Sequence, residues 1–170
     1  MSNFLHDRME VGDEIDLLPP AGDFFLDIAK TTPVVLLSGG VGQTPMLSML
    51  NTLVQKDHAA PIHYLHACEN GRQHAFRDHI ATLDSRHEQL HSFSWYRSPL
   101  DSDVIDRDYD AVGLMDLAPL KASILQDNTE FYFCGPIAFM RAIYKQLKSW
   151  GLEDSRLHYE LFGPHQTLED

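Results

Sequence analysis

Three short stretches of this 170-residue chain combine residue types that can hold or position a cofactor. The first is SGGVGQTPM at residues 38–46, which follows an apolar run and opens a helical pattern. Its glycines permit positive φ angles and close approach of the backbone to a ligand, and the start of a helix presents unpaired N–H groups. Such a loop fits a pyrophosphate, although the same glycines could equally serve only as a tight turn. It has neither the Gly-Lys-Ser/Thr of a Walker A loop nor G-x-G-x-x-G spacing.

The second stretch is FYFCGP at 131–136, and the third is HYELFGP at 158–164. Each follows a β-rich pattern and ends in a glycine-containing turn, so Cys134 is expected either beside a ligand or as a small buried hydrophobe. The third stretch is equally compatible with a simple chain terminator. Glu69 is a candidate ribose ligand or a solvated loop acid. The histidines form no His-x-x-x-His pair on a helix, and we predict no metal site.

The scaffold that would position these turns is indicated by the hydrophobic pattern. From residue 33 onward, short β-rich runs alternate with amphipathic stretches, which is typical of a parallel sheet with helices on both faces. We predict an α/β, three-layer αβα fold with a five-stranded, mainly parallel sheet. Ligands bind such sheets where the strand order reverses, between strands that end in turns like these. The predicted strands cover 33–38, 62–68, 90–96, 131–134 and 157–162, and the helices about 45–56, 76–83, 117–125 and 136–150. Thr44 is expected to cap the first of these helices, and Pro45 to be its first residue.

Residues 1–30 do not follow this alternation. They contain a short helical pattern, a turn and two strand-like stretches at 14–18 and 23–28, and they are too few to bury a core. We therefore predict a boundary near residues 30–33, with 1–30 as a piece of a second unit and 31–170 as the main domain. Unpartnered strand edges in 1–30 would be mobile or would pair with a second copy, which predicts a possible homodimer through this segment.

The composition excludes several classes of partner. A formal net charge of −12 without clustered Lys and Arg argues against nucleic acid. No apolar run approaches the ~20 residues that cross a bilayer, and the N-terminus is acidic, so we expect no membrane partner and a cytoplasmic location. Two cysteines without a CxxC pair are expected to stay reduced. The acids concentrate in 1–30, 101–110 and 153–170, which leaves a nearly neutral middle that can accept an anionic ligand.

In this order, the motifs resemble the pyridine-nucleotide half of the ferredoxin-NADP reductase superfamily, with SGGVGQTPM as its glycine loop and YFCGP as its nicotinamide turn. Six segments narrow the resemblance to the C-terminal reductase part of bacterial flavohemoglobins, the nitric oxide dioxygenases. These segments are SNFLHD, LLPPAGDFFL, ACENGRQHAFRD, GLMDL, FYFCGPIAFM and HYELFGPHQTL. The resemblance implies a ferredoxin reductase-like NAD-binding domain with strand order 3-2-1-4-5, preceded by a fragment of a β-barrel FAD domain.

The same resemblance implies roles for individual residues. NAD(P) would be bound by Gly39, Gly40, Val41, Gly42, Gln43, Thr44, Pro45, Cys134, Gly135 and Pro136. FAD would be contacted by Ser2, Asn3, Leu161, Phe162, Gly163 and Pro164. Cys134, Glu160 and Phe162 would act where hydride is transferred, with Phe162 covering one face of the flavin and Glu160 orienting the flavin or the hydride donor.

The function implied is the NADH-binding half of a reductase that passes hydride from NADH to FAD, and then electrons to haem, so that nitric oxide becomes nitrate. NADPH is the other candidate donor, because Arg97 and Ser98 could accommodate its 2′-phosphate. The family's globin domain and the Arg-x-Tyr-Ser motif that holds FAD are missing from these residues, so we expect nucleotide binding with little activity. Two alternatives are an NADH-dependent FAD reductase that feeds an oxygenase or a ferredoxin, and a non-catalytic nucleotide-binding module.

Overall fold

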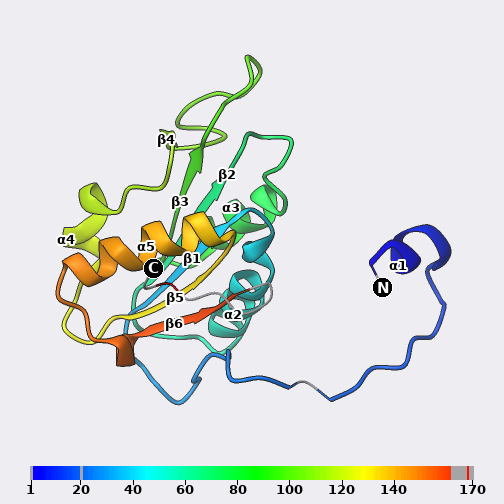
Figure 1. Ribbon diagram of the computed structural model, residues 1–170, viewed down its shortest axis with the longest axis horizontal. Helices are drawn as coiled ribbons and strands as arrows, with labels where there is room; N and C mark the ends of the chain where they lie inside the picture. Colours follow the sequence, from blue (N-terminus) through cyan, green and yellow to red (C-terminus); the bar gives the residue numbers. More distant parts are fainter. Residues whose placement is uncertain (1, 20, 162–167, 169–170) are drawn as a thin grey trace.

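The computed structural model describes residues 2–19, 21–161 and 168, and its centre is a six-stranded parallel sheet (Figure 1). The strands are β1 (Val34–Gly39), β2 (Ile62–Cys68), β3 (Leu90–Tyr96), β4 (Ala111–Val112), β5 (Glu130–Cys134) and β6 (Leu157–Glu160). Their order across the sheet is β4-β3-β2-β1-β5-β6, and every pairing is parallel. The five predicted strands and their order are confirmed. The two-residue β4 is added at one edge, beyond the strand at 90–96.

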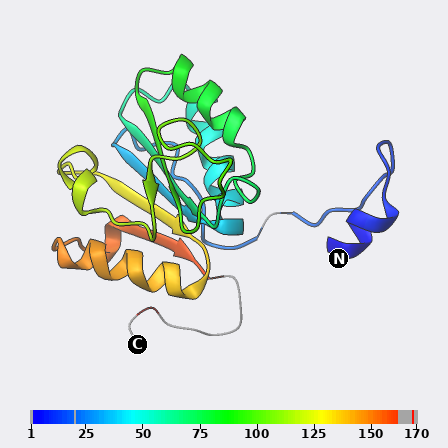
Figure 2. The ribbon, with the colours of Figure 1, turned by 90° about the horizontal axis from the view of Figure 1, so that it is seen from above.

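Helices cover both faces of this sheet, which confirms the three-layer prediction (Figure 2). The helical elements are α1 (Ser2–Arg8), η1 (Gly40–Gly42), α2 (Gln43–Gln55), α3 (Arg77–Arg86), η2 (Ala118–Leu120), α4 (Lys121–Ile124), α5 (Ile137–Ser149) and η3 (Asp154–Arg156). Side chains of α2 and α3 pack on one face with Val34 and Leu36, and those of α4 and α5 pack on the other with Val35 and Leu37. Strand β1 is buried on both faces, and its sequence is therefore apolar without alternation.

The start of α2 differs from the prediction. The helix begins at Gln43, and its N-cap is Gly42, which has no side chain to cap with. Thr44 lies inside the first turn, where its hydroxyl donates to the carbonyl of Val41 at 3.1 Å, and Pro45 follows it within the helix. The prediction of Thr44 as the cap is wrong, because the short η1 helix continues directly into α2.

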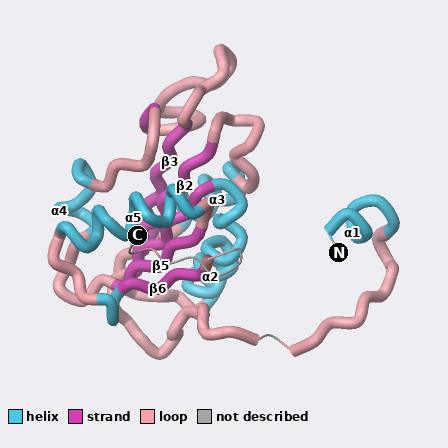
Figure 3. The backbone as a smooth tube through the Cα atoms, in the orientation of Figure 1, coloured by secondary structure: helices cyan, strands magenta, loops and turns pink. Residues whose placement is uncertain are grey.

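The segment before β1 has no strand in its described part, so the two strand-like stretches at 14–18 and 23–28 are wrong as predicted. The short helix α1 stands at the end of an extended loop, away from the sheet (Figures 1 and 3). The segment contacts the α/β body closer to β1, where Phe24 and Leu26 pack against the α2 side of the core. Alternating strand-like residues did not produce strands here because no neighbouring strand is present to pair with them.

Candidate functional site

Two glycine-containing turns meet at the carboxyl edge of the sheet, as the strand pattern predicted. A Cβ atom built on Gly42 would lie 2.1 Å from the carbonyl oxygen of Cys134, so only glycine fits there. A Cβ on Gly135 would lie 3.1 Å from the backbone nitrogen of Gly39. The turn after β1 and the turn after β5 are therefore packed backbone against backbone. They flank the position between β1 and β5 where the strand order reverses, which is where open parallel sheets bind ligands.

The ring of Phe139 lies over both turns. A Cβ on Gly39 would come within 2.8 Å of Phe139 Cγ, and one on Gly135 within 2.7 Å of Phe139 Cδ1. Phe139 belongs to the first turn of α5, so the helix and the two turns fit together as one packed unit. Phe139 is not one of the residues that the sequence motifs indicate, because an aromatic side chain near a helix start is not specific to a ligand site.

The backbone of the first turn has the form that an anion site needs. Gly40 has a φ of +50°, and a Cβ atom there would meet nothing within 4 Å, so its surroundings are open. The N–H of Gln43 donates to the carbonyls of Gly40 and Val41, which closes the η1 turn. At the start of α2 the N–H of Gln43 is thus used by η1 and Pro45 has no N–H, whereas the start of α5 presents N–H groups at the same edge that have no partner within that helix.

A cleft of about 310 Å³ opens beside these turns on the α5 face, and we call it the edge cleft. Its walls come from the ends of β1 and β2, the loops after β2, β3 and β4, and the start of α5. The lining residues are Gly39, Gly40, Ala67, Cys68, Glu69, Gln73, Arg97, Gly113, Leu114, Met115, Pro136, Ala138, Phe139, Ala142 and Ile143. Glu69 and Arg97 both line it, so the cleft carries one charge of each sign beside an apolar floor. The structure thus brings Glu69 to the cleft.

Cys134 is fully buried and lies outside the lining of the edge cleft. Its thiol donates to the carbonyl oxygen of Glu160 at 3.5 Å, across the register that pairs β5 with β6. Burial raises the pKa of this thiol to about 11, followed in size by the influence of Glu160, so the thiol stays protonated at neutral pH. The Glu160 residue itself is exposed at the end of β6, and Leu161 follows it half-buried.

The sequence-predicted residues fall into three groups. Those at 39–45 and 134–136 come together at the carboxyl edge. The helix that holds Ser2 and Asn3 lies away from that edge (Figures 1 and 2). Three predicted flavin contacts, Phe162, Gly163 and Pro164, lie outside the described residues.

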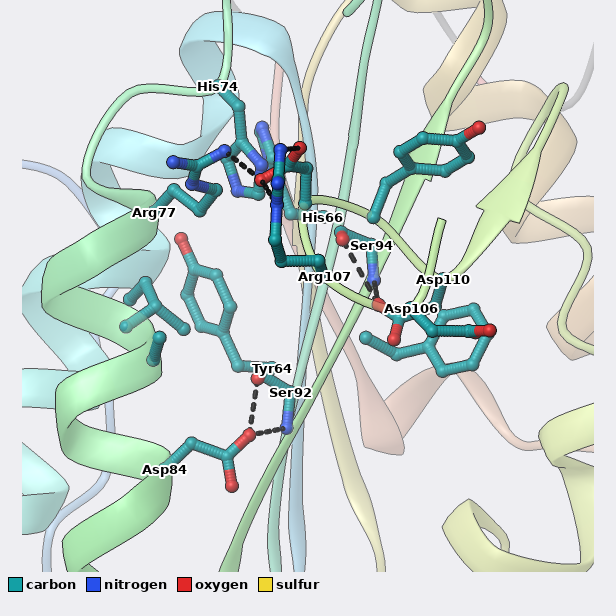
Figure 4. A pocket seen from close by; sticks show the side chains of 15 residues that line it. Tyr64, His66, His74, Arg77, Asp84, Ser92, Ser94, Asp106, Arg107 and Asp110 are labelled. Atoms are coloured by element: carbon teal, nitrogen blue, oxygen red, sulfur yellow. Dashed lines mark hydrogen bonds and ion pairs between the residues drawn. The ribbon is translucent and has the colours of Figure 1, made fainter. Parts of the chain in front are cut away.

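A second cavity, of about 190 Å³, lies on the opposite face between α3 and the 106–110 loop, and we call it the α3 cavity (Figure 4). Figure 4 labels Tyr64, His66, His74, Arg77, Asp84, Ser92, Ser94, Asp106, Arg107 and Asp110 in its wall. Its charged side chains are mostly bound to the protein itself. Asp108 accepts from Arg77 at 2.7 Å and from Arg107 at 2.6 Å. Asp110 accepts from the backbone N–H of Ser94 at 2.7 Å, and Asp84 from that of Ser92 at 2.9 Å.

His66 connects this cavity to the glycine turn. Its Nδ1 lies 2.8 Å from the hydroxyl oxygen of Ser38, the residue directly before Gly39, and its ring lies tilted against that of His74 at 4.9 Å between centroids. Burial, and then the neighbouring His74, lowers the pKa of His66 to about 3, so the ring is neutral at pH 7. The root of the glycine turn is thus held by a neutral, buried hydrogen bond.

Two features are absent from the described ranges. No group of three or more His, Cys, Asp or Glu side chains there is arranged to hold a metal ion. No helix among the same residues is both long and apolar enough to cross a membrane.

A parallel αβα sheet with two touching turns and two helix starts at its reversal point defines a nucleotide-binding α/β domain. The chain belongs to the oxidoreductase NAD-binding domain family, whose model matches residues 36–145. The residues present fit the nucleotide that this family binds, because the space around Gly40 is open and the start of α5 offers N–H groups that the helix leaves unpaired.

Two relatives confirm the resemblance to the reductase part of flavohemoglobins. The chain is 42% identical over 169 residues to the flavohemoprotein of Bacillus cereus, covering 99% of this chain and 42% of that protein. It also matches the flavohem-like FAD/NAD-binding domain of nitric oxide dioxygenase from Vibrio cholerae O1 biovar El Tor. That match has 38% identity and a TM-score of 0.80, and covers 96% of this chain and 64% of the other. The chain therefore spans less than half the length of the flavohemoprotein it matches.

The fold alone extends to more distant reductases. The cytochrome b5 reductase domain of Ulva prolifera nitrate reductase has a TM-score of 0.77 at 19% identity, and covers 95% of this chain and 65% of the other. At that identity the match supports the ferredoxin reductase-like fold and carries no information on the substrate.

Proposed function

We propose that this chain is the NADH-binding half of a flavohemoglobin-type reductase, which passes hydride from NADH to FAD. The observation that carries the proposal is the backbone contact between the glycine turn and the Cys134–Pro136 turn beside the edge cleft. The glycine turn supplies N–H donors for the pyrophosphate, and the Cys134–Pro136 turn supplies a surface on which the nicotinamide ring of the same ligand can pack. The similarity to the flavohemoprotein of Bacillus cereus supports the assignment.

Each part of the edge cleft has a separate task in this proposal. The N–H groups at the start of α2 bind the pyrophosphate, helped by the positive end of the helix dipole. Gly135 and Pro136 position the nicotinamide ring, and the protonated Cys134 thiol adds no charge beneath it. Bound NADH supplies the hydride. The protein contributes orientation and exclusion of water, and Glu160 places a carboxylate on the side where the chain leaves β6.

We also propose a division of the chain at about residue 30, with 1–30 belonging to an FAD-binding barrel and 31–170 forming the NAD(P)H-binding domain. The described part of 1–30 has no strand, and it exposes Val11, Leu17 and Leu18, which a partner domain would cover. Ser2, Asn3, Leu161, Phe162, Gly163 and Pro164 would contact FAD in that arrangement. A globin domain with haem would then accept the electrons and convert nitric oxide to nitrate.

In the chain alone, a second copy would cover the same apolar side chains and form a homodimer through residues 1–30. Light scattering of the wild-type chain is expected to give a dimer mass, and Leu17→Glu with Leu18→Glu a monomer mass. A wild-type monomer whose residues 1–30 are protected from hydrogen exchange would contradict the homodimer.

The decisive experiment is calorimetric titration of NADH into the wild-type chain and two matched glycine variants. Gly40→Asp places a carboxylate beside the proposed pyrophosphate, and we expect the affinity for NADH to fall by at least about 30-fold. Gly151→Asp is the control, because Gly151 also has a positive φ and open space around it but lies after α5. Equal affinities of the two variants would refute the assignment of the pyrophosphate to this turn.

A further inference from the structure

A buried carboxylate at the other end of the sheet joins the segment that enters the α/β body to strand β6. Glu130 opens β5 and is buried. Its Oε1 accepts from Lys30 Nζ at 2.8 Å, and its Oε2 accepts from His158 Nε2 at 2.6 Å. Lys30 belongs to the segment by which the chain enters the α/β body, and His158 belongs to β6, so both oxygens are used by elements distant in sequence.

Further contacts near Glu130 hold the entering segment against the sheet. The backbone N–H of Glu130 donates to the carbonyl of Pro33 at 2.9 Å, and His58 Nε2 donates to the carbonyl of Thr32 at 3.0 Å. Phe24 lies 6.4 Å from the ring of Tyr132, measured between centroids. Residues 24–33 are therefore fixed to β5 by apolar, backbone and charged contacts together.

The outgoing strand is fixed by the same carboxylate. The ring of His158 stacks on Tyr132 with a centroid distance of 4.5 Å, and the register of β5 with β6 places Glu160 opposite Cys134. Only Tyr159 separates His158, which is bonded to Glu130, from Glu160 at the end of β6, and Leu161 follows directly.

The electrostatics make the two contacts interdependent. Burial alone would raise the pKa of Glu130, but its hydrogen bonds to Lys30 and then His158 outweigh burial and lower that pKa. Without Lys30, the buried Glu130 carboxylate would lose the positive charge that offsets its burial. The charged form of Glu130 would then be less favourable, and its hydrogen bond to His158 would weaken.

We propose that Glu130 is a positioning residue that couples the entering segment, residues 24–33, to strand β6 and hence to the flavin-side residues at its end. The functional role of this coupling rests on the proposed function, because the flavin domain would attach through residues 1–30. Displacement of that domain would then be transmitted across the sheet edge to Glu160 and Leu161.

Hydrogen–deuterium exchange of the wild-type chain and its variants tests this coupling. Lys30→Met changes a residue of the entering segment and none of β6. We nevertheless expect exchange to rise by about tenfold both in 24–33 and in 157–161. His158→Asn is expected to produce the reciprocal effect in 24–33. Lys30→Arg keeps the charge and should restore protection in both segments. Lys145→Met, at an exposed lysine on α5, is the matched control and should change neither.

Two further measurements separate the possible outcomes. If each variant raises exchange only in its own segment, the contacts are independent and the proposal is wrong. Exchange of β2 amides reports global unfolding, and it must stay at the wild-type level for a rise in 157–161 to support coupling. NADH affinity is expected to stay unchanged in every variant. A wild-type chain that binds no NADH would refute the proposed function, while the exchange data would still decide the coupling.

Discussion

The edge cleft and the α3 cavity lie on opposite faces of one sheet and differ in how their polar groups are used. In the α3 cavity Asp108 is bound by two arginines, and Asp84 and Asp110 are bound by serines of β3. In the edge cleft, the donors are backbone groups at the start of α5, which the helix itself leaves unpaired, beside the open turn at Gly40. A cavity rich in charged side chains can thus be a structural network, whereas a cleft formed by glycines offers more to a ligand.

The largest effect is expected where the two turns of the edge cleft touch. Gly42 has an ordinary helical φ of −61°, so Gly42→Ala introduces no backbone strain, only a clash with the Cys134 carbonyl. We expect the free energy of unfolding to fall by about 3 kcal/mol or more in urea titrations. Gly40→Ala adds strain at positive φ without a clash and should lower it by about 1 kcal/mol. Equal losses in the two variants would show that the turns are not in contact.

A second effect, confined to acid, is expected from the histidines behind the glycine turn. The pKa of His66 is lowered from 6.5 to about 3, mainly by burial, and that of His74 to about 4, by burial and then by Arg77. The unfolded chain therefore binds more protons than the folded one below pH 6.5. Stability should fall as the pH drops from 6.5 toward 3, by up to about 1.4 kcal/mol per pH unit for each histidine.

His66→Gln tests that origin of the acid sensitivity. The variant should show a shallower loss of stability between pH 6.5 and 4 in urea titrations, since one of the titrating groups is gone. Its NADH affinity at pH 7 should change by less than about threefold, because the ring is neutral there and is not part of the edge cleft. An unchanged pH dependence would place the acid sensitivity elsewhere.

Asp108 should affect the stability of the fold at a lower pH than the histidines do. Its hydrogen bond to Arg107, then that to the Val104 N–H, lowers its pKa to about 2. A carboxylate with a lowered pKa stabilises the fold above its ordinary pKa of 3.8, and this contribution is lost as the pH falls toward 2. Asp108→Asn should lower the melting temperature at pH 7 and flatten its dependence on pH between 4 and 2. A pH dependence identical to wild type would contradict the proposed role of the ion pairs.

The smallest effect concerns the choice of nucleotide. Arg97 lines the edge cleft together with Glu69, and we propose that NADH is preferred because this pair leaves no net positive charge for a 2′-phosphate. Arg97→Ala should weaken NADPH binding by about threefold at low salt and affect NADH less. A wild-type chain that binds NADPH more tightly than NADH, with the difference abolished in this variant, would reverse the preference.

The sequence was sufficient for the features that depend on neighbouring residues. The apolar run at 33–38, the glycines after it and the helical pattern from 136 onward identified β1, the first turn and α5, because each element carries its own local signal. The same reasoning failed for 14–18 and 23–28, where a strand requires a partner that these residues lack. The prediction of Thr44 as the cap failed because no local residue pattern indicates that η1 runs directly into α2.

The sequence pattern did not predict contacts between residues that are distant in the sequence. Nothing local indicates that Arg77 meets Asp108, that His66 meets Ser38, or that the ring of Phe139 covers two glycines. The two-residue strand β4 is too short to produce a periodic signal. These contacts form only when the sheet brings strands, helices and loops that are distant in sequence side by side.

The ring of Phe139 has a consequence for how this domain tolerates mutation. Because the ring fills the space above Gly39, a larger residue there is excluded only while the ring is present, whereas at Gly135 the backbone of Gly39 crowds a larger residue as well. Substitutions at these three positions should therefore be strongly non-additive. A smaller side chain at 139 would open room for alanine at 39. In a library of variants, residues 39 and 139 would change together or remain unchanged together, and the substitutions tolerated at one would depend on the residue at the other.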